Sequence, residues 1–263
     1  MKRGFIELLI SPRQAKQNPW LLAALAFVFV STGVIVEILL PVIQGAVVVF
    51  AMVPAIPLIW SLLVREEHEE EKQLKLLKSS SVAYHLPLLE VFAFFFVGAT
   101  AAYAFWYSFL PAELSKTIFS AQLEEIKNIG LTVGKVIEWN FATRLFQHNL
   151  MVLAFMLVFS LVYGVGSIYL LLWNSSIIGV FIGGKLLAGG LPALLSGLVG
   201  IFPHGVFELG AYFIATVAGG ILSAAIMRRH THLPEFKLIA FDVVKLLLLA
   251  LLMLAVGAVV EAT

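Results

Sequence analysis

Long apolar runs separated by short polar segments make up most of this 263-residue sequence. A helix that crosses a bilayer needs about 20 predominantly apolar residues. Six runs meet this length, at residues 20–40, 41–64, 86–110, 150–173, 207–227 and 239–260. The pattern therefore predicts an all-α fold, a polytopic bundle of transmembrane helices.

A further apolar run, residues 174–202, is interrupted by seven glycines and by Pro192. Such residues are tolerated in membrane helices where neighbouring helices satisfy the freed backbone groups. If this run crosses the bilayer once, the bundle has about seven spans. If it is re-entrant, the count falls to six, and every segment after Trp173 changes side.

Two polar segments connect these runs. Residues 65–78 carry many charges at helical spacing, which predicts a solvated, charged connector between two spans. Residues 111–148 form the longest polar segment, yet apolar side chains recur every three or four residues, at Phe119, Leu123, Ile126, Val133, Ile137, Phe141 and Leu145. This periodicity predicts an amphipathic interfacial helix on the membrane surface.

The composition agrees with a membrane protein and excludes other classes. Hydrophobic residues make up 61% of the chain and charged residues 13%, against about 25% charged in a soluble domain. The net charge of +1 gives no basic excess for nucleic acid, and the absence of cysteine excludes disulfides and thiolate chemistry. Because the sequence also lacks the common phosphate-binding, nucleophile and zinc motifs, we expect no enzyme activity, no cofactor and no metal.

The distribution of positive charge predicts the orientation. Cytoplasmic loops of membrane proteins carry an excess of Lys and Arg. With seven spans, twelve of the 17 basic residues share one side, namely Lys2, Arg3, Arg13, Lys16, Arg65, Lys72, Lys75, Lys78, Lys185, Arg228, Arg229 and Lys237. We therefore expect a multi-pass protein of the cell membrane with a cytoplasmic N-terminus, and with residues 111–148 and a turn at 203–205 on the outer face.

Ionisable residues at membrane depth are costly and are candidates for function. They are Glu37, Glu90, His204, Glu208, Asp242 and Lys245. Asp242 and Lys245 are three residues apart, which favours a local ion pair. His204 and Glu208 are four apart on one helix face, which fits a hydrogen-bonded pair, a proton or ion site, or a metal site completed by Glu37, His148, Asn149 or Asn174.

Glycines cluster in the second half of the chain. In membranes, small residues allow helices to approach closely, and this is the reading that we favour for Gly164, Gly166, Gly179 and the Gly183-Gly184, Gly189-Gly190 and Gly219-Gly220 pairs. The alternative is a broken helix or pore lined by backbone carbonyls.

Several of these residues occur in a characteristic order. Phe146-x-x-Asn149 opens a run, Gly164-x-Gly166, Asn174 and Gly179 follow, and Pro203-His204-Gly205-x-x-Glu208 comes after the glycine-rich stretch. Over about residues 117–227 this order resembles the stage II sporulation protein M family of multi-pass membrane proteins. The resemblance implies a core of an amphipathic lead-in, an Asn-bearing helix and a His-Gly-x-x-Glu element. The family's namesake is a membrane scaffold that recruits peptidoglycan-degrading partners during engulfment of the forespore.

These observations predict one integral membrane domain, residues 1–263. It comprises a three-span part, residues 1–110, the family-like core, residues 117–227, and a last span, residues 239–260. Three functions remain open: a non-catalytic scaffold that forms a homodimer or binds other membrane proteins through 65–78 or the amphipathic segment, a transporter or channel around His204 and Glu208, and a metal enzyme. We expect the first.

Overall fold

The computed structural model describes residues 10–40, 45–77, 82–133, 139–163, 165–227 and 234–262. All regular elements within these ranges are helices, which confirms an all-helical protein for this part of the chain. They are α1 (Pro12–Gln17), α2 (Trp20–Leu39), α3 (Val47–Leu77), the short 3-10 helix η2 (Val82–His85), α4 (Leu86–Phe109), α5 (Ala112–Ile118), α6 (Ser120–Val133), α7 (Trp139–Tyr163), α8 (Ser167–Met227) and α9 (Pro234–Ala262).

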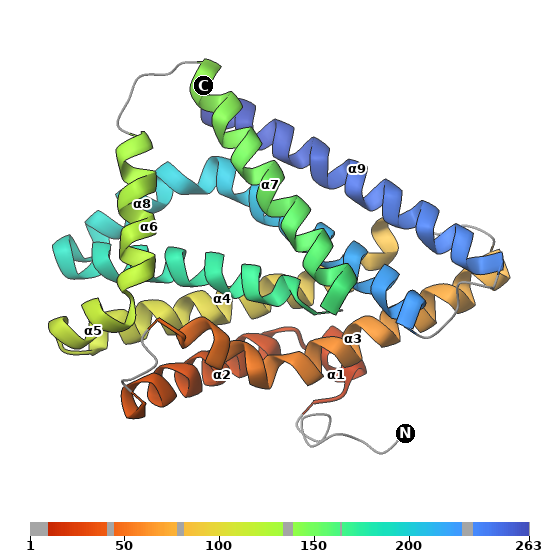
Figure 1. Cartoon of the computed structure of the whole chain (residues 1–263), viewed down its shortest axis with the longest axis horizontal. Coiled ribbons are helices and arrows are strands. Elements are labelled where there is room, and N and C mark those ends of the chain that lie inside the picture. Colours follow the sequence, from red (N-terminus) through yellow and green to blue (C-terminus); the bar gives the residue numbers. More distant parts are fainter. Residues whose placement is uncertain are drawn as a thin grey trace.

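Helix α8 is the centre of the bundle. It packs against α3, α4, α7 and α9, and α2 lies beside both α3 and α4. In Figure 1, α2, α3 and α4 run along the long axis of the molecule, whereas α7 and α9 lie at an angle to them. The chain therefore forms one packed bundle around α8.

Within the described ranges, five helices are long and apolar enough to cross a membrane: α2, α3, α4, α8 and α9. The bounds of α2 and α4 agree with the predicted runs 20–40 and 86–110 to within one residue. Helix α7 contains a shorter apolar stretch, Phe146–Leu161. The membrane-protein class is thus supported by the structure, and the number of crossings depends on how α7 and α8 are divided.

Helix α8 reverses direction at Gly189 and Gly190. Gly190 has φ 63° and ψ −151°, a backbone conformation that residues other than glycine essentially never adopt. The turn divides α8 into a first limb, residues 167–188, and a second limb, residues 191–227, which runs back beside it (Figure 1). Residues 174–202 are therefore not one continuous span. The range contains a turn, as the re-entrant alternative requires, but the two limbs extend beyond it on both sides.

The boundary between α7 and α8 also differs from the prediction. The predicted span 150–173 is broken, since α7 ends at Tyr163 and α8 begins at Ser167. Gly166 makes this sharp return possible, because a Cβ atom there would lie 2.5 Å from the carbonyl oxygen of Phe159. The prediction of a turn at 203–205 is also wrong, because these residues lie inside the helical second limb, which accommodates Pro203.

Residues 65–78 are not a solvated connector. Up to Leu77 they continue α3, and the side chains of Glu66, Glu67, Glu70 and Glu71 are buried at 0, 0, 1 and 6% exposure. These four glutamates share one face of the helix, and that face packs into the bundle instead of facing water. Lys78 lies outside the described residues.

The predicted amphipathic helix over 111–148 is divided into several elements. Its first part forms the two short helices α5 and α6, and from Trp139 onward the chain belongs to α7. Phe119, one of the periodic apolar positions, is fully buried between α5 and α6. The apolar periodicity therefore identified the packed side at Phe119, Leu123 and Ile126, but it did not reveal the break between α5 and α6. The side chains of Val133, Ile137, Phe141 and Leu145 lie outside the described residues.

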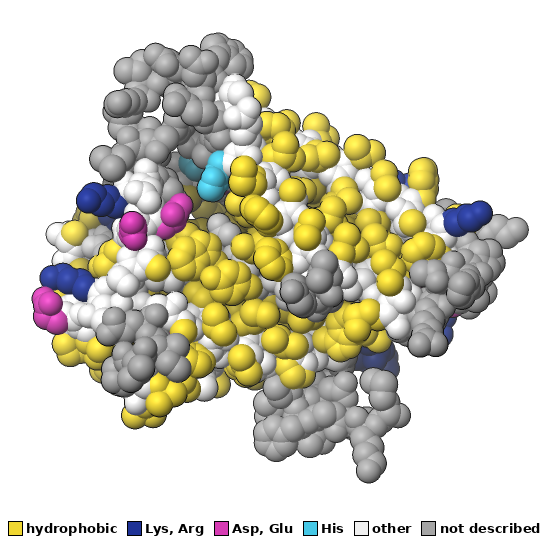
Figure 2. Space-filling view, in the orientation of Figure 1, with side chains coloured by type: hydrophobic (Ala, Val, Ile, Leu, Met, Phe, Trp, Pro, Cys, Tyr) yellow, Lys and Arg dark blue, Asp and Glu magenta, His cyan; other side chains and the backbone are white. Residues whose placement is uncertain are grey.

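The two ends of the bundle differ from its middle in charge. Figure 2 shows hydrophobic side chains over the middle of one face, with charged side chains gathered over α5 and α6 at one end and further cations at the opposite end. Lys185 belongs to the α5 end, since a Cβ atom on nearby Gly183 would lie 2.9 Å from the carbonyl oxygen of Ala104, near the C-terminus of α4. Its predicted place with the cytoplasmic cations is therefore wrong, because the α8 hairpin brings it to the other end.

Candidate functional site

One polar cluster inside the bundle contains residues of the family motif. We call Asn149, His204, Glu208 and Tyr212 the outer cluster. The last three are spaced by four residues on the second limb of α8, so they share one helix face, and Asn149 lies on α7. Asn149 and Tyr212 are buried, whereas His204 and Glu208 are half-buried.

Asn149 connects the two helices of the outer cluster through both ends of its amide. Its Nδ2 donates a hydrogen bond to Glu208 Oε1, and its Oδ1 accepts one from Tyr212 Oη at 2.9 Å. Each atom of the amide thus has a defined partner, which fixes its orientation. The amide of Asn149 thus joins α7 to α8 by two hydrogen bonds.

Helix α9 covers the outer cluster at Gly257. A Cβ atom at Gly257 would lie 3.5 Å from the carbonyl oxygen of His204 and 3.6 Å from Cγ of Glu208. His204 is one helical turn from Glu208, as its spacing predicts. The cluster therefore lies where α7, α8 and α9 meet.

Other predicted site residues lie apart from this cluster. Asn174 donates to the carbonyl oxygen of Leu170 in its own helix at 2.8 Å. Glu37 is buried at the end of α2 and accepts from the backbone N–H of Gly45 at 2.6 Å, just before α3 begins. Glu37 therefore stabilises a helix start, where negative charge is favoured, and it does not join Asn149 and Glu208.

The remaining ionisable candidates have local surroundings of different kinds. Glu90 is exposed near the start of α4. Asp242 and Lys245 form the expected ion pair, with 2.5 Å between Lys245 Nζ and Asp242 Oδ1. The ammonium of Lys245 also lies 4.7 Å from the ring centre of Phe241, a favourable cation–π distance.

Among the motif glycines, Gly179 serves close packing between two helices. A Cβ atom at Gly179 would lie 2.5 Å from Cβ of Tyr103 and 2.7 Å from the carbonyl oxygen of Thr100. The first limb of α8 therefore packs directly on the backbone of α4. Gly205 is buried within the second limb, and Gly164 lies outside the described residues.

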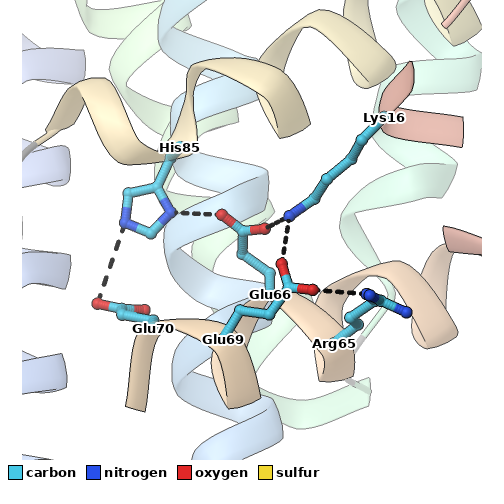
Figure 3. A network of polar contacts seen from close by, with 6 residues as sticks. All are labelled: Lys16, Arg65, Glu66, Glu69, Glu70 and His85. Carbon is cyan, nitrogen blue, oxygen red and sulfur yellow. Dashed lines mark hydrogen bonds and ion pairs between the residues drawn. The ribbon is translucent and has the colours of Figure 1, made fainter. Parts of the chain in front are cut away.

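A second polar cluster, which the sequence pattern did not predict, lies at the opposite end of the bundle. In this acidic network, the carboxylate of Glu66 forms an ion pair with Nζ of Lys16 on α1. Its Oε1 lies 2.9 Å from Nδ1 of His85 on η2 (Figure 3). Glu69 pairs with Lys16 at 2.9 Å and with Nε of Arg65 at 2.6 Å. The network thus connects α1, α3 and the start of α4.

Lys16 neutralises two carboxylates of this network, those of Glu66 and Glu69. Burial alone would lower the pKa of Lys16, but the carboxylates of Glu66 and Glu69 outweigh it and hold this pKa above its usual value. Because the folded-state pKa is raised, the stabilisation is complete below the ordinary lysine pKa of about 10.4 and is lost as the pH rises through the raised value.

One of the two missed features left a signal in the sequence. Tyr212 follows His204 and Glu208 at the same four-residue step, so it belongs to their helix face. The burial of Glu66, Glu67, Glu70 and Glu71 left none, because Arg65, Glu69 and Lys72 put charges on the other sides of the same helix. In the part of the chain that the structure describes, no group of three or more His, Cys, Asp or Glu side chains is arranged to hold a metal ion.

Comparison with known proteins extends the resemblance seen in the sequence. Residues 91–263 match the sequence model of the family described as stage II sporulation protein M. An uncharacterized protein of Methanocaldococcus jannaschii is 30% identical over 128 residues, which are 48% of this chain and 70% of that protein. No solved structure matches the chain. Because the match spans more than half of the chain and includes the outer cluster, this protein belongs to the stage II sporulation protein M family.

Proposed function

We propose that the protein is a non-catalytic scaffold or component of a membrane protein complex. The observation that carries this proposal is how the polar groups of the outer cluster and of Glu37 are bonded. The Asn149 amide bonds Glu208 and Tyr212, and Glu37 accepts from the backbone at the start of α3. A transport path needs polar groups that can exchange partners with a solute, whereas these groups bond to the protein itself and fix its helices in place.

Helices α5 and α6 are the surface that we expect to bind partners. Their inner face is anchored by Ser115 Oγ, which donates to the carbonyl oxygen of Tyr107 at 3.0 Å, and by Gln122 Nε2, which donates to Ser176 Oγ at 3.2 Å. Their outer face is polar and exposed, at Glu113, Lys116, Thr117, Glu124, Lys127 and Asn128. Residues 65–77 are the weaker candidate, since their four central glutamates are buried.

We further propose seven membrane crossings in the cell membrane, with a cytoplasmic N-terminus. The crossings are α2, α3, α4, α7, the two limbs of α8, and α9. This arrangement places α5, α6 and the α8 turn outside, and the acidic network inside. Moving Lys185 to the outer side leaves most of the basic residues on the cytoplasmic side, so the charge bias still supports the orientation.

A photo-crosslinker at Lys127 tests the scaffold proposal. We expect adducts with another membrane protein or a second copy of this chain in native membranes, and we expect Glu124→Lys to remove them. The control position is Leu248, which is 61% exposed on α9 and apolar, and where we expect lipid adducts. Lipid adducts alone at Lys127, or protein adducts that Glu124→Lys leaves unchanged, would contradict the proposal.

A second candidate function is a transporter or channel around His204 and Glu208 of the outer cluster. It is supported by the meeting of Glu208, Asn149 and Tyr212 from two helices at one end of the bundle. Purified protein in liposomes distinguishes the two functions. A solute or proton flux that is lost in Glu208→Gln would favour transport over the scaffold.

A further inference from the structure

Three buried titratable side chains from three elements meet beside the acidic network. Glu70 on α3 and His85 on η2 are each 1% exposed, and Asp242 on α9 is 5% exposed. His85 Nε2 lies 4.0 Å from Glu70 Oε1, and Figure 3 shows the imidazole ring between Glu66 and Glu70. The carboxyl groups of Glu70 and Asp242 also face each other. We call these three residues the inner junction.

The inner junction has polar atoms without donors. Among the described residues, no hydrogen-bond partner reaches Oε1 or Oε2 of Glu70, Oδ2 of Asp242 or Nε2 of His85, and all four atoms are buried. Buried polar groups in proteins are nearly always hydrogen-bonded, and an unpaired one costs about 1–3 kcal/mol. Two facing carboxylates add like-charge repulsion to that cost. A ligand that donates a hydrogen bond and carries positive charge would satisfy these atoms and reduce the repulsion.

Nearby charges are already engaged with other partners. Lys245 Nζ pairs with Oδ1 of Asp242, the other oxygen of that carboxylate. Lys16 is bound by Glu66 and Glu69. The charged and titratable groups that surround the junction are Lys16, Glu66, Glu67, Tyr84 and Lys245.

The orientation of the His85 imidazole places its Nε2 atom, a hydrogen-bond acceptor, toward Glu70. Glu66 is a carboxylate bound to Lys16, so His85 Nδ1 must carry the hydrogen in its 2.9 Å contact with Glu66 Oε1. In the neutral ring, Nε2 is then a lone pair that faces Glu70. A proton on Glu70 would turn one of three facing acceptors into a donor, which bonds Asp242 or, with a small side-chain movement, His85.

We propose that Glu70, Asp242 and His85 form a proton-binding site that holds one exchangeable proton at the junction of α3, η2 and α9. No bond other than that to the proton forms or breaks. A proton fits better than a metal ion, because the junction offers too few ligands and no metal-binding group occurs in the described chain. Release of the proton leaves two carboxylates face to face, which weakens the packing of α9 on α3.

Infrared difference spectroscopy of the full chain in lipid nanodiscs tests this site directly. At neutral pH we expect the C=O stretch of a protonated carboxyl group, and we expect it to disappear in alkaline buffer. Glu70→Gln should lack the band at every pH. Glu69→Gln is the matched control, since Glu69 is a partly exposed neighbour already paired with Lys16 and Arg65, and it should keep the band.

Thermal unfolding supplies a second readout. A proton held only in the folded state stabilises it at low pH, and that contribution is lost as the pH rises through the titration of the site. We expect the Tm of the wild-type protein to fall from neutral to alkaline pH, and that of Glu70→Gln to fall less than half as much. If Glu70→Gln does not fold, Asp242→Asn should also lack the band, because Asn supplies the missing donor.

Three results would overturn the proposal. The first is a wild-type protein without the carboxyl band at any pH, and the second is a band that persists in both Glu70→Gln and Asp242→Asn. The third is a Tm that depends on sodium or calcium concentration and not on pH, which would assign the junction to a metal cation. None of these outcomes bears on partner binding at α5 and α6, so the site and the scaffold proposal are tested separately.

Discussion

Replacing Gly98 by alanine is expected to lower the Tm of the protein by roughly 5–10 °C. A Cβ atom at this position on α4 would lie 2.1 Å from the carbonyl oxygen and 2.5 Å from Cα of Ala23 on α2. Both are backbone atoms, so the clash cannot be relieved by rotating a side chain. The whole of α2 must move away from α4, at an overpacking cost of about 1–3 kcal/mol or more. Thermal unfolding in nanodiscs measures the effect.

The matched control for Gly98→Ala is Gly200→Ala. Gly200 lies in the second limb of α8, and no atom would come within 4 Å of a Cβ atom there. Alanine is also favoured over glycine in a helix by about 1 kcal/mol, so this variant should match or slightly exceed the wild-type Tm. Equal Tm values for Gly98→Ala and Gly200→Ala would contradict the close crossing of α2 and α4.

The second large effect is expected from Asn149→Leu, which removes the centre of the outer cluster. The change takes a donor from Glu208 and an acceptor from Tyr212, whose hydroxyl is buried beside it. Leaving buried polar groups without partners costs about 1–3 kcal/mol. We therefore expect the free energy of unfolding to fall by about that amount, measured by denaturant titration in mixed micelles.

Asn174→Leu makes the same chemical change at a site with a different role. Asn174 is half-buried, and its amide donates to the Leu170 carbonyl of its own helix. Because that carbonyl can keep its helical hydrogen bond, we expect a change of less than about 0.5 kcal/mol. A loss of unfolding free energy for Asn174→Leu as large as that for Asn149→Leu would contradict the stabilising role of the outer cluster.

Much of the fold could be predicted because hydrophobic run length is a strong signal in a membrane protein. The runs at 20–40 and 86–110 became α2 and α4 almost residue for residue. The family resemblance seen between residues 117 and 227 is confirmed, and the match extends over residues 91–263. Within the outer cluster, the four-residue spacing of His204 and Glu208 placed both on one helix face.

The chain reversals were harder to predict, because in an apolar sequence a turn changes the backbone and not the hydrophobicity. Gly189-Gly190 was read as helix packing, although Pro192 follows at the distance expected after a turn. The break before Ser167 was missed for the same reason. Charge was also misleading, since Glu66 and Glu70 were expected to face water, whereas both are buried inside the bundle.

The helical hairpin of α8 sets the topology of the bundle, and thiol labelling of single cysteines tests it. The native chain has no cysteine, so Ala188→Cys at the turn, Lys127→Cys on α6 and Lys72→Cys on α3 each add one exposed thiol. With a membrane-impermeant maleimide in sealed vesicles, Ala188→Cys and Lys127→Cys should label from the same side, and Lys72→Cys only from the other. Labelling of Ala188→Cys together with Lys72→Cys, and not with Lys127→Cys, would contradict the hairpin.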